Sequence, residues 1–320
     1  MGSGGRRGNT VAAMFHDPTY LAFAPLLGWF LHAILRLGPL EGWLERWFER
    51  LAAQREFVAR QAFPGDPERG GLAALVMIVV LVGFAAWALR AMGYILGQHD
   101  GRLVADVLIW LSLFSVRKRA FAGLDVMRSL AAGQTAQGRE QLRGIGGELP
   151  DDADQEAVAG RTVWRLGESI VDAGVLPLIY GALFGTPAGA AALAIAVLAR
   201  RLRRTAPDDP FGKVPRQVDA LLQAPAAAAG GGLVRLLSAA VGGQPDKAGW
   251  AWANSTALAP PARVARTVVG GLNLGPAAGG ATEGKAVVVE DIQRSVLLLW
   301  GTTFAATAAA TLLQFVSGLI

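Results

Sequence analysis

Two pairs of acidic residues in the second half of the chain have the types and spacing to bind a cation. Glu168 and Asp172 are four residues apart, so on a helix they share one face and repel each other unless a cation lies between them. Such a pair could hold a phosphate-bound magnesium ion, and the alternative interpretation is a solvated helix end. Asp208 and Asp209 form the second pair, for which a polar turn beside two prolines is the alternative.

The hydrophobic segment between the two pairs must position them. Residues 173–199 carry no charge and are long enough to cross a bilayer once, but Gly185, Thr186, Pro187 and Gly189 interrupt the segment. We therefore expect two half-helices, at 173–184 and 188–199, that enter the membrane and return through a turn at Pro187. Irregular backbone at that depth needs cover by protein or water, and such broken segments are a usual place for a site.

Basic clusters on both sides of this segment give the reason for the expected turn. Basic residues next to apolar segments lie mostly in the cytoplasm, and one straight crossing would put these two clusters on opposite sides of the membrane. A U-turn keeps both clusters on one side and brings the two acidic pairs together, so that they could form one acidic, magnesium-binding mouth. The clusters are Arg117, Lys118 and Arg119 before the segment and Arg200, Arg201, Arg203 and Arg204 after it.

Composition places the chain among polytopic membrane proteins. It has 320 residues, of which 52% are hydrophobic. The net charge of +5 comes from basic residues beside hydrophobic segments, where membrane topology explains them, so nucleic acid is not an expected partner. The absence of cysteine excludes disulfides and thiolate sites, and the separation of His16, His32 and His99 does not fit a zinc motif.

The N-terminal part contains one clear span and two weaker apolar segments. Residues 72–89 form the clear span. Residues 20–35 are either a short span or a helix in the membrane interface. Residues 40–61 form an amphipathic helix, whose Trp43 and Trp47 suit the headgroup level, although packing against the protein's own core is the alternative.

The rest of the chain alternates between polar and apolar elements. A short loop at 90–102 leads to a brief apolar run at 103–116, in which we expect Asp106 to lie near the interface and in contact with water. The other expected elements are a polar helical section at 117–172 with a break near 144–150, a helix at about 155–171, a loop at 205–217, a helix at 218–241, a mostly irregular stretch at 242–290 and a final span at 295–320.

These elements predict an all-α, polytopic integral membrane protein with a broken, re-entrant helix pair and amphipathic interfacial helices. We expect a single membrane domain over 1–320, located in a bacterial inner membrane, with the bulk of its polar loops in the cytoplasm. Its parts are a flexible N-terminus (1–19), N-terminal spans and an interfacial helix (20–116), a cytoplasm-facing region (117–294) that contains the pair at 173–199, and a C-terminal span (295–320).

The order of motifs between about 110 and 300 resembles the CobD/CbiB family of cobalamin biosynthesis, the adenosylcobinamide-phosphate synthases. That family has a segment like Glu-Asn-x-x-Asp-Gly-x-x-x-Pro-Leu-Phe-Tyr, which aligns here with Glu168 to Tyr180. The other matching elements are Gly185 to Ala190 for a Gly-x-Pro-Gly-Ala turn, Asp208-Asp209 and Pro215 for Asp-Asp-x-x-Asn-x-x-Pro-Ala-Arg, Gly249-Trp250, and Asp291-Ile292 for a late Asp-Ile-x-x-Ala element.

The chain also departs from the family pattern at several polar positions. Where the family has Asn-Thr-x-Asp-Ser, this chain has residues 197–201 (VLARR), and the Gly-Arg-Asp-Thr element falls on 147–150 (GELP). Ser169 and Gly212 replace two asparagines, and Pro-Ala-Arg has become Pro215-Arg216-Gln217. The loss of polar groups that contact the substrate typically costs orders of magnitude in rate. The pattern therefore predicts a family scaffold that is kept and a catalytic activity that is weakened.

The resemblance implies two alternative functions. An active member would join a carboxylate of adenosylcobyric acid to an amino alcohol phosphate at the expense of ATP. The alternative is a non-catalytic member that acts as a membrane scaffold, a regulatory protein or a subunit of a complex, with the helix at 40–61 as a surface for a membrane-protein partner. The resemblance implies catalytic roles for Glu168 and Asp172, magnesium ligation by Asp208 and Asp209, and phosphate or substrate binding by Arg200, Arg201, Tyr180 and Trp250.

Overall fold

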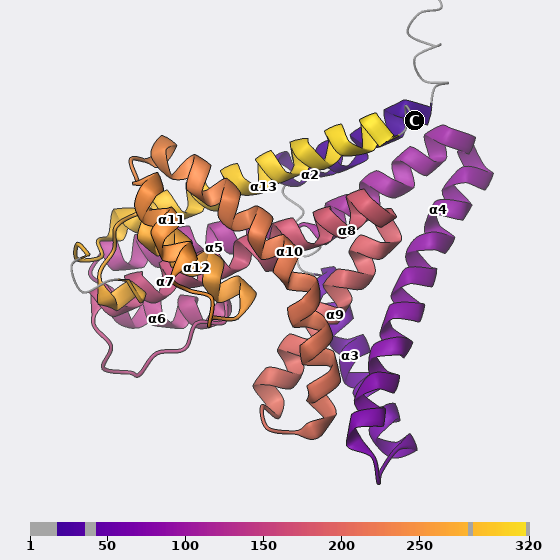
Figure 1. Cartoon of the computed structure of the whole chain (residues 1–320), viewed down its shortest axis with the longest axis horizontal. Helices are drawn as coiled ribbons and strands as arrows, with labels where there is room; N and C mark the ends of the chain where they lie inside the picture. The colour runs from indigo at the N-terminus through magenta and orange to yellow at the C-terminus, as the bar shows by residue number, and fades with distance from the viewer. Residues whose placement is uncertain (1–17, 36–42, 281–283, 318–320) are drawn as a thin grey trace, which may run out of the picture.

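The computed structural model describes residues 18–35, 43–280 and 284–317, and these residues fold almost entirely into helices (Figure 1). Within these ranges there is no β-strand, only an isolated bridge between Leu274 and Lys285. The all-α prediction is therefore confirmed. The longer helices are α2 (Ala24–Ile34), α3 (Trp43–Ala62), α4 (Pro67–Leu113), α5 (Val116–Ala131), α6 (Thr135–Gly144), α7 (Gln155–Ile170), α8 (Leu176–Phe184), α9 (Thr186–Thr205), α10 (Lys213–Ser238), α11 (Pro245–Ala253), α12 (Pro260–Gly271) and α13 (Val289–Ser317).

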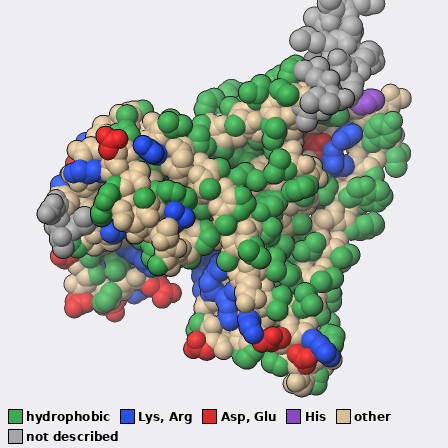
Figure 2. Space-filling model, in the orientation of Figure 1, with side chains coloured by type: hydrophobic (Ala, Val, Ile, Leu, Met, Phe, Trp, Pro, Cys, Tyr) green, Lys and Arg blue, Asp and Glu red, His purple; other side chains and the backbone are tan. Residues whose placement is uncertain are grey.

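Four helical stretches are long and apolar enough to cross a membrane, which fits the predicted polytopic protein. They are Pro67–Ala131, Gln155–Phe184, Pro210–Val241 and Val289–Val316. Hydrophobic side chains cover much of the surface over α4, α8, α10 and α13 in Figure 2, whereas basic side chains gather in the notch between the α5–α7 lobe and the lower ends of α9 and α10. The stretch at Pro210–Val241 is one that the sequence pattern did not mark as a span.

The predicted helical hairpin is present, with its break at Gly185. The backbone φ of Gly185 is 88°, a left-handed conformation that glycine tolerates, and α9 begins immediately after it with Pro187 in its first turn. α8 and α9 then run side by side, so closely that a Cβ on Gly189 would lie 2.6 Å from the carbonyl oxygen of Pro177. α9 continues to Thr205 and so carries the arginine cluster.

The first arm of the hairpin differs from the isolated half-helix at 173–184 that the sequence suggested. A π-helical turn, η3 (Val171–Val175), joins α7 directly to α8, so one helical run extends from Gln155 to Phe184. Pro177 has no N–H and leaves the carbonyl of Ala173 without its usual helical donor, and the backbone N–H of Ser115 donates to that carbonyl at 3.5 Å. The run can therefore pass Pro177 without ending, because another part of the chain supplies the missing donor.

The expectation that Asp106 is in contact with water is wrong, because its side chain is only 6% exposed. Asp106 accepts a hydrogen bond of 2.7 Å from the hydroxyl of Thr186, the first residue of α9, and pairs with Arg90 at 2.7 Å. The expected loop at 90–102 is instead helical on both sides of a sharp turn at Gly97–Gln98, which folds α4 back on itself. This turn brings Arg90 beside Asp106, and the ion pair fixes the tip of the α8–α9 hairpin to α4.

A second contact fixes the hairpin where Trp110 of α4 fills the space between α2 and α8. The indole is 1% exposed, and it stacks on Phe114 with the ring centroids 5.9 Å apart. A Cβ on Gly181 of α8 would lie 2.3 Å from the indole ring, and one on Gly28 of α2 would lie 2.6 Å from the Cβ of Trp110. Glycine at both positions therefore allows the two helices to approach Trp110 closely.

We expect Gly181→Ala to destabilise the protein and Gly83→Ala to leave it unchanged or slightly more stable. An added methyl at position 181 meets the indole of Trp110, and overpacking of this kind costs about 1–3 kcal/mol. Gly83 lies in α4, and a methyl added there would have no atom within 4 Å, so the same substitution removes only the unfavourable helix propensity of glycine. Thermal unfolding of the two variants in one detergent compares them, and equal melting temperatures would contradict this packing.

Two further sequence expectations are corrected. The stretch at 242–290 is not mostly irregular, because it contains α11 and α12, and the helix expected at 218–241 begins at Lys213. Prolines at 245, 260 and 261 occupy first turns of helices, where the missing N–H has no cost, rather than marking loops. The helix that the sequence placed in the membrane interface, α3, buries Phe48, Ala52 and Ala59 and packs against α4 and α9, so at least one of its faces belongs to the protein core.

Candidate functional site

A polar pocket of about 400 Å³ opens where α7, α9 and α10 meet. Its wall carries five arginines and three carboxylates, an excess of positive charge that favours an anionic ligand. The U-turn of the α8–α9 hairpin creates this arrangement. The chain leaves α7 into the hairpin, and the turn brings the end of α9, with its arginines, back beside α7. The charged residues of the wall are Arg161, Arg165, Arg200, Arg203, Arg204, Glu148, Glu168 and Asp172.

Asp172 is held at the centre of a polar network. It pairs with Arg200 at 3.2 Å and accepts a hydrogen bond of 3.3 Å from the side-chain amide of Gln223 on α10. Gln223 also donates to Asp219 at 2.9 Å, and Asp219, whose side chain is 1% exposed, pairs with Arg203 at 2.9 Å. The buried carboxylate of Asp219 therefore orients both an arginine of the pocket and, through Gln223, the carboxylate of Asp172.

Glu168 is oriented by its own helix. The indole N–H of Trp164 donates to Glu168 Oε1 at 3.0 Å, and the guanidinium of Arg165 donates to Glu168 Oε2. Arg165 also donates to the backbone carbonyl of Ile145, at 3.4 Å from Nε and 3.2 Å from Nη2. The loop before α7 thus holds one side of the pocket in place.

Gly146 allows two guanidinium groups to converge at the mouth of the pocket. Its φ is +79°, and a Cβ there would lie 2.7 Å from an Nη2 atom of both Arg165 and Arg204. A second cavity of about 210 Å³ shares Gly146, Arg200 and Arg204 with the first. The second cavity adds the charged side chains Arg46, Lys118, Arg119, Arg143 and Glu49, so the basic surface continues from one cavity into the other.

Three of the residues to which the sequence assigned a site role come together in this pocket, namely Glu168, Asp172 and Arg200, and Arg203 and Arg204 of the basic cluster join them. Arg201 lies on another face of α9 and pairs with Glu56 of α3 at 3.2 Å. The hydroxyl of Tyr180 donates to the backbone carbonyl of Leu222 at 3.0 Å, and Trp250 is an exposed side chain of α11. Neither aromatic residue lines the pocket, so their expected substrate contacts are not part of this site.

Sequence reasoning missed Arg161 and Arg165, half of the helix face that lines the pocket, although a signal was present. Arg161, Arg165, Glu168 and Asp172 follow one another at spacings of four, three and four residues, which places them on one face of a helix. That stripe is polar throughout, directly before an uncharged segment. Gln223 and Asp219 carried no comparable signal, because their role depends on how α10 packs against α9.

Asp208 and Asp209 do not join the first acidic pair, so the predicted single magnesium-binding mouth is not formed. Asp208 is exposed, whereas Asp209 pairs with Arg60 of α3 at 2.6 Å and accepts the backbone N–H of Phe211 at 2.9 Å. The guanidinium of Arg60 also lies 4.2 Å from the centre of the Phe211 ring. Asp209 therefore caps the 3-10 turn Pro210–Gly212 that leads into α10, and it ties this turn to α3. Among the described residues no group of three His, Asp or Glu side chains could hold a metal ion.

Asp209 should make the stability of the protein depend on pH. Burial alone would raise the pKa of Asp209, but hydrogen bonds from the Phe211 N–H and the Arg60 guanidinium outweigh burial and keep that pKa below its ordinary value. The unfolded state then binds the proton more tightly, so the stabilisation is present above the unfolded pKa and is lost as pH falls through the folded pKa.

We therefore expect Asp209→Asn to cost about 1–2 kcal/mol at neutral pH and much less once the pH lies below the folded pKa of Asp209. Thermal unfolding in detergent across this pH range measures the difference. Asp208→Asn is the matched control, because Asp208 is exposed and caps no helix. A difference between Asp209→Asn and the unmodified protein that stays constant with pH would argue against this role.

The fold and the pocket define a class, a helical protein with four potential membrane spans and an arginine-rich site at the polar end of a helical hairpin. The family model described as "CobD/Cbib protein" matches residues 12–269, so the chain belongs to the CobD/Cbib family. The match extends further toward the N-terminus than the motif resemblance did, and it ends before the Asp291-Ile292 element.

Three similar proteins carry the name "Cobalamin biosynthesis protein CobD". The protein of Rhodobacter capsulatus is 29% identical over 61% of this chain and 60% of its own length, and that of Citrobacter koseri is 29% identical over 54% of each. The protein of Clostridium perfringens is 25% identical over 44% of this chain and 45% of its own length. The chain thus spans about half of the curated relatives it matches. No solved structure matches it.

Proposed function

We propose that this protein is an ATP-dependent amide synthase that joins a corrinoid carboxylate to an amino alcohol phosphate during cobalamin biosynthesis. Membership of the CobD/Cbib family supports the pathway. The polar pocket supports the reaction class, because both ATP and an amino alcohol phosphate carry phosphate groups and five arginines line the pocket. The excess of guanidinium groups over carboxylates is the single observation on which the proposal depends.

Arginine is well suited to the binding that this reaction requires. Its planar guanidinium donates two parallel hydrogen bonds to a phosphate, and such charge-assisted bonds are about twice as strong as neutral ones. Arg203 and Arg204 line the pocket from the end of α9, where Arg203 also pairs with the buried carboxylate of Asp219, and Arg200 pairs with the carboxylate of Asp172 inside the pocket. We assign phosphate binding to Arg203, Arg204 and Arg165, and the second basic cavity offers room for a second phosphorylated substrate.

The chemistry proceeds in two steps. An oxygen of the corrinoid carboxylate attacks the γ-phosphorus of ATP, the bond to the β-phosphate oxygen breaks, and ADP leaves behind an acyl phosphate. The amine of the amino alcohol phosphate then attacks the acyl carbon, the acyl carbon–oxygen bond breaks, and inorganic phosphate leaves. The amine loses a proton in this step, and Asp172, with Glu168 beside it on the same helix face, is the proposed acceptor.

Magnesium enters this proposal with ATP rather than as a resident ion. Mg²⁺ is usually bound by one or two carboxylates together with substrate phosphates, so a site with three protein ligands is not required. Glu168, which stands in the pocket beside the arginines, would supply such a carboxylate for the ion that accompanies the phosphates, and Asp172 keeps the proposed role of base. The ion would supply positive charge for the phosphoryl transfer.

Some departures from the family pattern fit the same proposal. The segment of this chain that aligns with the family's Asn-Thr-x-Asp-Ser element ends with Arg200 and Arg201. Arg200 contributes a cation to the pocket. Glu148 stands where the family has Arg, and it also lines the pocket. We infer that the charges of the family's site have been redistributed between α7, α9 and the loop before α7.

Complementation of a bacterial strain that lacks the synthase tests the proposal together with nucleotide binding to the purified protein. We expect the protein to restore cobalamin-dependent growth and to bind ATP, and Arg203→Ala combined with Arg204→Ala to abolish growth and weaken ATP binding at least tenfold. Arg128→Gln is the control, because Arg128 is an exposed residue of α5 outside both cavities. A folded protein that neither complements nor binds ATP would contradict an active enzyme and leave the non-catalytic scaffold as the function.

A further inference from the structure

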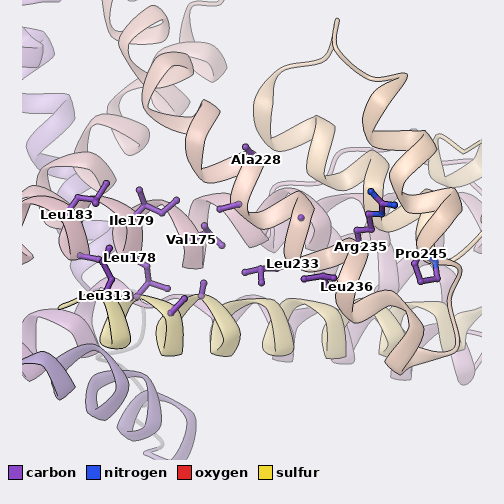
Figure 3. A pocket seen from close by; sticks show the side chains of 16 residues that line it. Val175, Leu178, Ile179, Leu183, Ala228, Leu233, Arg235, Leu236, Pro245 and Leu313 are labelled. Atoms are coloured by element: carbon purple, nitrogen blue, oxygen red, sulfur yellow. The ribbon is translucent and has the colours of Figure 1, made fainter. Parts of the chain in front are cut away.

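An elongated apolar groove of about 900 Å³ lies between α8, α10 and α13, separate from the polar pocket. All but one of the sixteen side chains that line it are apolar, and many are small residues such as Ala228, Gly232 and Ala309 (Figure 3). Leu183 and Leu313 lie at one end of the groove. The three helices belong to segments that could cross a membrane, so the groove opens toward lipid.

The exception is Arg235, which lies at the opposite end of the groove beside Pro245 (Figure 3). Its guanidinium packs over Gly249 of α11, where a Cβ would lie 3.1 Å from Arg235 Cζ. Arg235 is exposed, and no described carboxylate pairs with it. Arg235 therefore differs from the arginines of the polar pocket, several of which are neutralised by acidic neighbours.

The position of Arg235 matches the headgroup level of a bilayer. It lies in the last turns of α10, next to α11, and α11 carries Trp250, which is 58% exposed. Exposed tryptophan and arginine at the end of an apolar segment are typical anchors at a membrane–water interface. The groove runs from there along helices that are apolar enough to lie in the hydrocarbon region.

We propose that this groove is a binding site for an anionic phospholipid, with an acyl chain along α8, α10 and α13 and the headgroup phosphate on Arg235. An acyl chain matches a long groove that offers no hydrogen-bonding side chain between Leu313 and Arg235. A phosphate gives the single cation the anionic partner that the described side chains do not supply. The proposal goes beyond the synthase reaction, because no residue of the polar pocket lines this groove.

Native mass spectrometry of the protein, released from nanodiscs that contain equal amounts of phosphatidylglycerol and phosphatidylcholine, tests the proposal. We expect the unmodified protein to retain phosphatidylglycerol at least fivefold more than phosphatidylcholine. Arg235→Gln should remove that preference, whereas Arg235→Lys should keep part of it. Ala309→Trp, which fills the groove, should reduce the retention of both lipids. Arg128→Gln should behave like the unmodified protein.

Melting temperatures of all variants, taken in detergent, show whether each of them is folded. Equal retention of the two lipids by the unmodified protein, or a preference that persists in Arg235→Gln, would overturn the proposal. A dimer that survives release and that Ala309→Trp disrupts would also overturn it, because a second copy would then occupy the groove. ATP binding is measured on the same samples, so failure of the lipid site and failure of the synthase proposal give different results.

Discussion

Asp172→Asn should lower the rate of the proposed amide formation by about 10²- to 10⁴-fold, the range typical for loss of a general base. Asparagine keeps the size of the side chain and its contact with Gln223, but it cannot accept a proton or neutralise Arg200. The measurement is the rate of amide formation by the purified protein under saturating ATP. The affinity for ATP should change much less, because Arg203, Arg204 and Arg165, to which we assign phosphate binding, are unchanged.

The matched control is Asp125→Asn, which changes an exposed, ion-paired carboxylate of α5 in the same way. A base is needed only in the chemical step, so Asp172→Asn should lower the turnover rate while Asp125→Asn leaves it unchanged. A rate within threefold of the unmodified protein would exclude Asp172 as the base.

Asp106→Ala should lower the free energy of unfolding by about 3–5 kcal/mol, the usual cost of removing one partner of a buried ion pair. The substitution leaves the guanidinium of Arg90 without its carboxylate and the hydroxyl of Thr186 without its acceptor. The tip of the α8–α9 hairpin would then lose its link to α4. Denaturant unfolding in mixed micelles measures the change.

The same experiment distinguishes a buried Asp106 from the solvent-exposed Asp106 that the sequence suggested. Removal of a solvent-exposed carboxylate would lower the free energy of unfolding by less than about 1 kcal/mol, as expected for the exposed pair of Asp125 and Arg128. Asp125→Ala is therefore the control. Similar losses of stability in Asp106→Ala and Asp125→Ala would contradict the anchoring of the hairpin.

The hairpin itself could be predicted because it follows from local features of the chain. Gly185 and Pro187 interrupt an uncharged segment, and the basic residues on both sides require a return to the same side of the membrane. The prediction that Glu168 and Asp172 share a helix face was equally local, since it depends only on a spacing of four residues. These two predictions correctly placed part of the pocket.

Features that depend on tertiary packing could not be predicted in this way. Asp209 was assigned to the pocket because it follows α9 in the sequence, but Arg60 of α3 holds it elsewhere. Arg201 differs from Arg200 by one residue and therefore by about 100° around α9, which is enough to direct it to Glu56. The sequence suggested that Asp106 contacts water, because it lies near the start of a short apolar run. Only the sharp turn at Gly97 brings Arg90 beside it.

The most direct test of the arginine-rich pocket is product formation by the purified protein in nanodiscs, supplied with adenosylcobyric acid, an amino alcohol phosphate and Mg-ATP. We predict one ADP for each amide formed, and loss of both products when Arg203 and Arg204 are replaced by alanine, with Arg128→Gln unaffected. Amide formation that continues unchanged in the double variant would show that the chemistry occurs outside the pocket between α7, α9 and α10.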